Sequence, residues 1–171
     1  VPNLPTTQAR IKVKASGNIF FDISNQNFTI SEDTGPPAND AICSAISLNC
    51  GDSLLGTNVH ATRSSLGVPS CGSGTENDVF YKFNATAGNT YTIRVNGDNY
   101  DAILAIYSGF CSSTLTEIAC ADDGLSPGIA ETIVFTPTED LSIYIQTYDW
   151  SITEGDFYIT LDCVFANDDP C

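Results

Sequence analysis

Hydrophobic and polar positions alternate along most of the second part of this chain. From residue 79 onward, short apolar runs with a period of two are separated by clusters of Gly, Asn, Asp and Pro. This period is typical of half-buried strands, and such clusters are typical of turns. Beyond a turn near 41–47, no stretch shows helical periodicity, so the fold class is all-β: an antiparallel β-sandwich with jelly-roll or Greek-key connections. The predicted strands are 79–83, 90–95, 102–107, 115–119, 132–135, 141–147 and 157–161.

Shorter strands are also predicted near the N-terminus. Charged and apolar residues alternate at 9–14, and apolar runs at 19–23 and 27–30 follow a Ser-Gly-Asn turn. An N-terminal β-hairpin segment of this size is marginally stable in water because it buries no core of its own. We therefore divide the chain into a strand segment at 1–31, a linker with Gly and two Pro at 32–37, and the sandwich at 38–165.

A short sequence pattern from the start of the sandwich is repeated just after its end. The pattern Ala-Asn-Asp-x-x-Cys occurs at 38–43 and again at 166–171. We interpret 166–171 as the start of a following repeat of the same module, with a C-terminal tail of similar loop composition as the alternative. A repeat leaves Cys171 without a partner in this chain, which explains the odd number of seven cysteines.

The cysteines indicate the compartment. They lack the paired Cys-x-x-Cys spacing of zinc sites, and one histidine does not complete a mixed site. A disulfide framework is the better interpretation, which predicts a secreted protein with an extracellular or cell-surface location. Six cysteines allow fifteen connectivities. Spacing favours Cys111–Cys120 as a short loop, Cys50–Cys71 as a second loop, and Cys43–Cys163 as a tie between the first and last strands.

The charge distribution limits the partners. Basic and acidic residues balance in the first 33 positions, so the net charge of −15 falls on the rest of the chain. Such an acidic surface repels phosphate backbones and predicts no nucleic-acid partner. It favours solubility and divalent cations. No apolar run approaches the roughly 18–20 residues of a spanning helix, so we expect no membrane span.

Candidate catalytic groups are few. Nucleophilic hydrolysis needs a Ser or Cys beside a general base, and the single histidine, His60, lies in a polar stretch typical of the surface. The His-Glu-x-x-His sequence of metalloproteases does not occur. Acidic residues suitable for glycoside cleavage are abundant, but they fall on predicted turns, as in any acidic sandwich. We predict that the chain is not an enzyme.

Several sequence stretches resemble one kind of module: Asn-Asp-x-x-Cys at 39–43, Asp-Val-Phe-Tyr-Lys-Phe at 78–83, Asp-Ala-Ile-Leu-Ala-Ile-Tyr-Ser-Gly at 101–109 and Cys-Ala-Asp-Asp at 120–123. In this order they are similar to the pre-peptidase C-terminal-like (PPC-like) β-sandwich domains of secreted multidomain proteins of Bacteroidetes-type bacteria. The resemblance covers about 38–165. It implies a non-catalytic accessory region attached to a secreted enzyme or adhesin.

Two further resemblances concern parts of the chain. Residues 9–30 resemble the closing strands of the immunoglobulin-like domain that follows the protease in secreted metallopeptidases of the same bacteria. This resemblance implies that 1–31 is a remnant of such a domain or a set of donated strands. The sandwich also distantly resembles CUB domains, in which an Asp-x-x-x-x-x-Tyr-x-Gly strand and the acidic turn after it bind calcium.

Calcium is therefore the cofactor that we expect. Asp98 and Asp101 flank the turn before the 102–107 strand, and Asp122 and Asp123 form a second acidic turn. Carboxylates and loop carbonyls are the ligands that Ca²⁺ prefers. The alternative is that these are ordinary turn aspartates that cap their own backbone. We expect a metal site made by Asp101, Asp122 and Asp123, with Asp98 as a further ligand.

Two aromatic residues are candidates for ligand stacking. Tyr148 and Trp150 follow the 141–147 strand, and Trp150 is the single Trp of the chain. An aromatic ring on a loop offers a stacking platform for a sugar. The alternative, which we favour, is that Trp150 folds back over the end of the sandwich.

Three functions compete at this point. The leading hypothesis is a module for binding, spacing or cell adhesion in a secreted bacterial protein, with other domains or copies of that protein as partners. The second is a structural subunit of an extracellular filament, in which N-terminal strands are exchanged between neighbouring subunits. The third is a carbohydrate-binding module with a glycan as its ligand.

Overall fold

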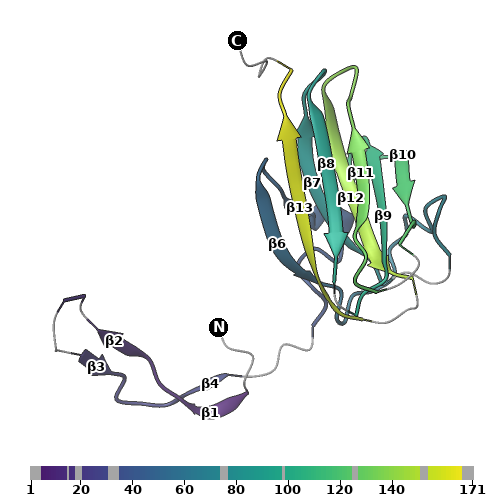
Figure 1. The fold of residues 1–171 in the computed structure, drawn as a ribbon. Helices are drawn as coiled ribbons and strands as arrows, with labels where there is room; N and C mark the ends of the chain where they lie inside the picture. The colour runs from purple at the N-terminus through teal and green to yellow at the C-terminus, as the bar shows by residue number, and fades with distance from the viewer. Residues whose placement is uncertain are drawn as a thin grey trace. The chain divides into compact units, whose positions relative to one another are not determined.

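The computed structural model describes residues 5–14, 16–17, 21–30, 35–73, 77–97, 99–124, 127–150 and 154–166 (Figure 1). Contacts within the chain divide it into two units, Val1–Gly35 and Pro36–Cys171. The second unit is an all-β sandwich, and the first is a narrow ribbon of paired strands.

Two sheets form the sandwich (Figure 1). Their orders are β10-β9-β12-β7-β5 and β11-β8-β13-β6, and all neighbours are antiparallel except β5 and β7. The successive strands β6 to β13 alternate between the sheets except for β9 and β10, which is the winding of a jelly roll. The predicted fold class is confirmed. The strand bounds are β5 Ile46–Ser47, β6 Asp52–Thr57, β7 Val79–Ala85, β8 Thr90–Asn96, β9 Ala102–Ser108, β10 Thr116–Ala121, β11 Glu131–Phe135, β12 Leu141–Asp149 and β13 Asp156–Val164.

Each sheet turns one face toward a shared core. In β8, alternate residues from Tyr91 to Val95 are buried and those between them are not, as the two-residue period of a strand requires. In β9, every residue from Ala102 to Tyr107 is buried. This strand lies between β10 and β12, and its outer face belongs to a second cluster that includes Phe80 and the partly buried Leu66. Burial on both faces explains its continuous apolar sequence.

The sequence pattern did not predict β5 or β6. Adjacent leucines in β6 break the alternation: Leu54 packs against the core, whereas Leu55 is exposed. Gly56 follows, and a Cβ there would lie 2.6 Å from the Phe157 ring. Glycine therefore marks a close approach of two strands rather than a turn. The turn expected near 41–47 contains one turn of 3-10 helix, Ile42–Ser44 (η1).

The first unit contains two short antiparallel strand pairs. β1 (Thr6–Ala9) pairs with β4 (Phe28–Ile30), and β2 (Lys12–Lys14) pairs with β3 (Phe21–Ile23). Between the pairs, the Ser24 N–H donates to the Ile11 carbonyl oxygen at 2.9 Å. The apolar side chains of Ile11, Val13 and Phe21 are exposed. The ribbon therefore buries little apolar surface of its own.

The described disulfides differ from all three predicted pairs. The bonds are Cys43–Cys111, Cys50–Cys163 and Cys71–Cys120. The predicted Cys111–Cys120 pair is wrong because of the β9–β10 register: Cys120 lies opposite Ala105, whereas Cys111 follows the end of β9 at Ser108. The strand between Ala105 and Ser108 spans about 10 Å, which exceeds the roughly 4.4–6.8 Å between the Cα atoms of a disulfide.

The other two predicted pairs fail for similar reasons. Cys50 and Cys71 lie beyond opposite ends of β6, so they do not bond. The Cys43–Cys163 prediction correctly placed a disulfide on the last strand through Cys163, but the partner of Cys163 is Cys50 and not Cys43. Leu161 lies opposite Asp52 in the β13–β6 register, and continuing that register brings Cys163 opposite Cys50. Cys50 therefore ties the first strand of the jelly roll to the last.

The three disulfides indicate an oxidising compartment, extracellular or periplasmic. Within the part of the chain that the structure describes, no helix is long and apolar enough to cross a membrane. The repeat predicted at 166–171, with Cys171, lies outside the described residues apart from Ala166.

Candidate functional site

Several carboxylates gather at the end of the sandwich where the acidic turns lie. Asp101 precedes β9 and Asp122 follows β10, and the antiparallel pairing of these strands brings the two residues together. Glu131 is the first residue of β11, and Asp149 is the last residue of β12. The charge of Glu131 acts on both Asp101 and Asp122, and that of Asp149 acts on Asp101. We call Asp101, Asp122, Glu131 and Asp149 the acidic cluster.

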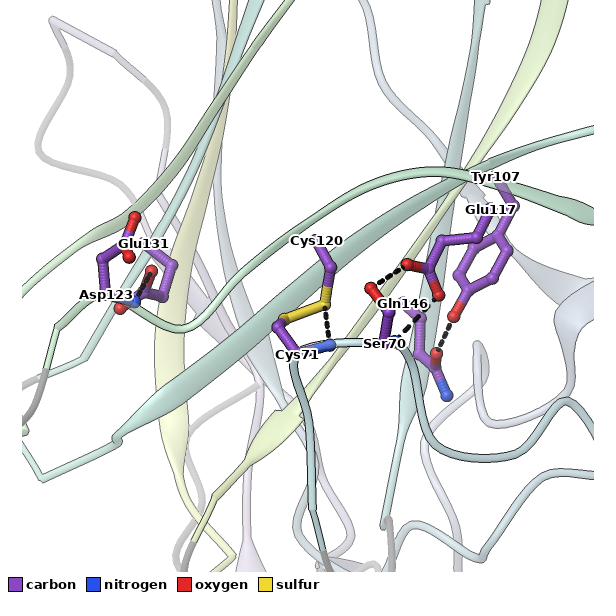
Figure 2. The surroundings of a disulfide bond; sticks show 8 residues. All are labelled: Ser70, Cys71, Tyr107, Glu117, Cys120, Asp123, Glu131 and Gln146. Carbon is purple, nitrogen blue, oxygen red and sulfur yellow. Dashed lines mark hydrogen bonds between the residues drawn. A yellow bond between two sulfur atoms is a disulfide. The ribbon is translucent and has the colours of Figure 1, made fainter.

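Glu131 and Asp149 are buried and hold the turns through backbone hydrogen bonds. The Asp101 N–H donates to Asp149 Oδ2 at 2.8 Å. The Asp123 N–H donates to Glu131 Oε2 at 2.9 Å, as Figure 2 shows. The Gly124 N–H donates to Glu131 Oε1 at 2.5 Å, and a Cβ at Gly124 would lie 2.5 Å from that oxygen. These carboxylates therefore satisfy backbone donors at the strand ends, and one turn requires glycine.

The two partly buried members of the cluster, Asp101 and Asp122, are in an electrostatically unfavourable environment. Desolvation raises the pKa of Asp101, and the charges of Asp149 and Glu131 raise it further. Desolvation likewise raises the pKa of Asp122, followed by the charges of Glu131, Asp101 and Asp123. Asp101 Oδ1 is shielded from solvent and accepts no hydrogen bond from another described residue. A buried oxygen without a donor or cation destabilises the fold.

The structure places only two of the four expected metal ligands in the acidic cluster. Asp101 and Asp122 lie in the acidic cluster, the Asp123 side chain is exposed, and Asp98 lies outside the described residues. Among the described residues, no group of three or more His, Cys, Asp or Glu side chains is arranged to hold a metal ion. Sequence reasoning missed Glu131 and Asp149, which lie just outside the predicted strands 132–135 and 141–147. Their position at strand ends beside acidic turns was the available signal.

The two aromatic residues expected to stack on a ligand, Tyr148 and Trp150, differ in their exposure to solvent. Tyr148 is 1% exposed, and a side chain at Gly72 would collide with its hydroxyl group. The prediction of Tyr148 as a stacking platform is therefore wrong, because this residue is part of the packed interior. Trp150 is 49% exposed, and its backbone N–H donates to the Asp101 carbonyl oxygen at 2.8 Å. The two roles weighed for Trp150, sugar stacking and packing over the end of the sandwich, both stay predictions.

A buried polar network fixes the connection between β6 and β7. Asp78 accepts hydrogen bonds from the Ser64 N–H at 2.9 Å, the Ser64 hydroxyl at 2.6 Å and Gln146 Nε2 at 2.6 Å. The Tyr107 hydroxyl donates to Gln146 Oε1 at 2.8 Å (Figure 2). Burial raises the pKa of Asp78, and the hydrogen bonds from Ser64 and Gln146 oppose this effect. The network is structural, since its polar groups bond to one another.

The same connection is anchored twice more. The Cys71–Cys120 disulfide joins it to β10, and the Cys71 N–H lies 3.3 Å from Cys120 Sγ (Figure 2). The Ser70 N–H donates to Glu117 Oε2 at 3.0 Å, and the Ser70 hydroxyl donates to the other oxygen of Glu117 (Figure 2). His60, in the same connection, is exposed, and its Nδ1 lies 4.0 Å from Glu154 Oε2. None of these contacts pairs His60 with a Ser or Cys nucleophile.

Two of the clefts on the described part of the sandwich bear on ligand binding. The larger, of about 530 Å³, lies between η1, the connection after β6 and the β9–β10 turn, and its lining includes Ile42, Arg63 and Leu115. The second, of about 440 Å³, lies on the four-stranded sheet near the start of β13, and its lining includes Leu55, Asn96 and Tyr158. Tyr158 is an exposed aromatic residue, and sequence reasoning did not single it out.

Comparison with known proteins yields structural likenesses alone. No family model matches the sequence, and no curated protein matches it. The chain is similar to the pre-peptidase C-terminal domain of a collagenase from Bacillus anthracis, with 13% identity over 69% of this chain and 94% of that chain and a TM-score of 0.45. It is also similar to PliG of Aeromonas hydrophila, a periplasmic inhibitor of g-type lysozyme, with 13% identity over 70% of this chain and 96% of that chain and a TM-score of 0.47. Likenesses at this level do not identify what the chain binds.

Proposed function

We propose that this chain is a non-catalytic extracellular accessory module that binds, spaces or attaches parts of a secreted bacterial protein. The observation that carries the proposal is the jelly roll whose loops and terminal strands are cross-linked by three disulfides. Such cross-links suit a module that stays folded outside the cell. The buried carboxylates Asp78 and Glu131 support the proposal because they bond to loop backbone and neighbouring side chains.

Retention on an extracellular polymer tests this function. The full chain, fused to a fluorescent protein, is mixed with insoluble cellulose, chitin, peptidoglycan and fibrillar collagen, and the bound fraction and soluble products are measured. We expect retention on at least one polymer without release of products. Release of soluble fragments would identify an enzyme and overturn the proposal, as would the absence of retention on every polymer.

Calcium is part of the proposal. We assign Asp101 and Asp122 as ligands, with Asp123 and Asp98 completing the site. Two observations support a cation there: the unpartnered, buried Asp101 Oδ1, and the desolvation and repulsion by neighbouring carboxylates that raise the pKa of both Asp101 and Asp122. A hard cation offsets such repulsion and accepts carboxylate oxygens as ligands. When bound, it would lower the cost of bringing the two acidic turns together.

Thermal unfolding in calcium and in EDTA tests the metal proposal. Calcium at about 100 times its Kd stabilises the folded state by roughly 2.7 kcal/mol if it binds that state alone. We expect a higher Tm in calcium than in EDTA, and loss of the difference in Asp101→Asn and Asp122→Asn. Glu139→Gln changes an exposed acid outside the cluster and should keep the difference. An identical Tm of the original chain in both buffers would exclude the site.

A second function is assembly through the N-terminal ribbon. The exposure of Ile11, Val13 and Phe21 favours it, because an isolated hairpin with uncovered apolar side chains is marginally stable. Open strand edges also recruit further strands. We compare the full chain with a deletion of residues 1–33 by light scattering. Assembly predicts oligomers of the full chain and monomers of the truncated chain, and the same number of subunits in both would eliminate it.

A further inference from the structure

The smaller cleft lies on the outward face of the four-stranded sheet. One row of residues crosses three neighbouring strands there: Leu55 of β6 lies opposite Tyr158 of β13, and Tyr158 lies opposite Asn96 of β8. Leu55 is 66% exposed and Tyr158 is 57% exposed, so both present side chains to solvent. Asp156 lies two residues before Tyr158 in the same strand and thus on the same face. We call this site the Tyr158 groove.

The backbone keeps one end of the Tyr158 groove open. Gly97 and Gly155 both line it, and neither carries a side chain. A Cβ at Gly97 would lie 2.5 Å from the Asp156 carbonyl oxygen, so the two segments approach too closely for another residue. The buried Asn58 holds Gly155 in place: its Oδ1 accepts from the Gly155 N–H at 2.8 Å, and its N–H donates to the Gly155 carbonyl oxygen at 3.1 Å. The groove is therefore built on fixed backbone.

The polar side chains of the groove are available to a ligand. Asn96, Asn99 and Asp156 line it, and their side chains form no hydrogen bond with another described residue. Glu154, which also lines it, is engaged, because its carboxylate accepts from the His60 N–H at 3.0 Å and from Asn77 Nδ2 at 3.2 Å. The groove thus offers amide donors and acceptors and a carboxylate beside an exposed ring.

We propose that the Tyr158 groove binds a neutral sugar, as part of an oligosaccharide chain. The negative face of an aromatic ring attracts the polarised C–H groups of a pyranose face. Neighbouring amide and carboxylate groups bind the sugar hydroxyls at the ring edge. A volume of about 440 Å³ lies within the roughly 300–1,000 Å³ of small-molecule sites.

Charge selects the class of sugar. Asp156 and Glu154 line the groove, and the chain has a net charge of −15. An anionic sugar, such as a uronic acid, would be repelled by this field. The inference rests on the proposed role of the sandwich as a binding module and specifies one ligand of that module. It replaces Tyr148 and Trp150 as the stacking platform with Tyr158.

Binding of the full chain to an array of neutral and anionic oligosaccharides, including cellohexaose, chitohexaose and oligogalacturonate, tests the inference. The neutral sugar with the strongest signal is then titrated by calorimetry. We expect Tyr158→Ala to weaken binding by about tenfold or more, equivalent to about 1.4 kcal/mol. Tyr158→Phe should keep most of the affinity because it retains the ring. Val134→Ala removes an exposed apolar side chain outside the groove lining and should bind normally.

The outcomes separate this inference from the proposed function. Because Tyr158 is exposed, its substitution should leave the Tm unchanged, and that measurement accompanies each titration. Retention on an insoluble polymer that Tyr158→Ala leaves intact would overturn the groove as the site while the binding module stands. A preference for oligogalacturonate, or no binding to any neutral sugar, would also overturn the groove. If the original chain binds no sugar of the array and is retained on no insoluble polymer, both proposals are overturned.

Discussion

Removing the Cys50–Cys163 disulfide should destabilise the sandwich strongly. This bridge joins Cys50, two residues before β6, to Cys163, the last residue but one of β13, and so connects the first and last strands of the jelly roll. We consider Cys50→Ala, Cys163→Ala and the double variant. Because both cysteines belong to one bond, each single variant and the double variant should lose the same constraint.

The loop length gives the magnitude. The two cysteines are 113 residues apart in sequence. The chain-entropy relation for a loop of this length gives about 4.8 kcal/mol at 25 °C. The 49-residue separation of Cys71–Cys120 gives about 4.1 kcal/mol by the same relation. Since folded domains are stable by roughly 5–15 kcal/mol, loss of the longer loop removes a large share of the total. We expect Tm to fall by roughly 10–20 °C.

Guanidinium unfolding of the three variants measures the effect, and non-reducing peptide mapping checks the bonds. The structure predicts equal losses of unfolding free energy in the two single variants and the double variant. If Cys50 bonded to Cys71 and Cys163 bonded to Cys43, as spacing had suggested, the double variant would break two bridges. Its loss would then approach the sum of the single losses. A sum of this kind would refute the register argument for the pairing.

Other predictions concern the core and the buried acids. Gly56→Ala should lower the unfolding free energy by about 1–3 kcal/mol, because its Cβ collides with the Tyr81 hydroxyl; unchanged denaturant midpoints would contradict the close packing of β6. Asp78→Asn should lower the unfolding free energy by about 1–3 kcal/mol, because the new NH₂ group would face a hydrogen-bond donor of the network instead of accepting from it. Chemical unfolding measures this loss, and an unchanged unfolding free energy would refute it. The pKa of Asp78, Asp101 and Asp122 is raised in the folded state, so the folded state binds protons more tightly than the unfolded state. Their contribution is complete below the unfolded value of 3.8 and is lost as pH rises through the folded values, so these three groups should raise Tm in EDTA as the pH is lowered from neutral toward 3.8. A decrease in a scanning calorimeter over that range would contradict the sign.

The strands of the sandwich were predictable because their side-chain period is local. The stretches predicted at 79–83, 90–95 and 157–161 all lie within observed strands. β6 was not predictable from its period, since Leu55 points outward beside the core-facing Leu54 and Gly56 serves packing rather than a turn. Local alternation identifies a strand when polar residues occupy its outward face, and β6 lacks that contrast.

The disulfides and the acidic cluster depend on register, which short-range patterns do not contain. Cys50 meets Cys163 because β6 pairs with β13, more than a hundred residues away in sequence. Glu131 meets Asp122 because β11 begins at the end of the sandwich where β10 ends. Asp101 and Asp122 were predictable candidates, since both flank apolar strands that pair with each other.

The candidate sugar site likewise combines one feature that is local in the sequence with others that depend on strand pairing. Alternation in β13 places Tyr158 outward, between the buried Phe157 and Ile159. Its neighbours Leu55 and Asn96 come from two other strands, and the groove exists only when the three strands are aligned. Tyr148, by contrast, was a candidate because it follows a predicted strand, but it lies inside β12 and is buried.

Adsorption of the fluorescent fusion to insoluble cellulose, chitin, peptidoglycan and collagen, with simultaneous assay of soluble products, tests the central claim most directly. A binding module without catalytic activity predicts a saturable isotherm on at least one polymer and no products at any protein concentration. Reduction of the disulfides under denaturing conditions should abolish the retention, because binding requires the folded sandwich. Soluble products that increase with protein concentration, or isotherms indistinguishable from the fluorescent protein alone, would contradict the account.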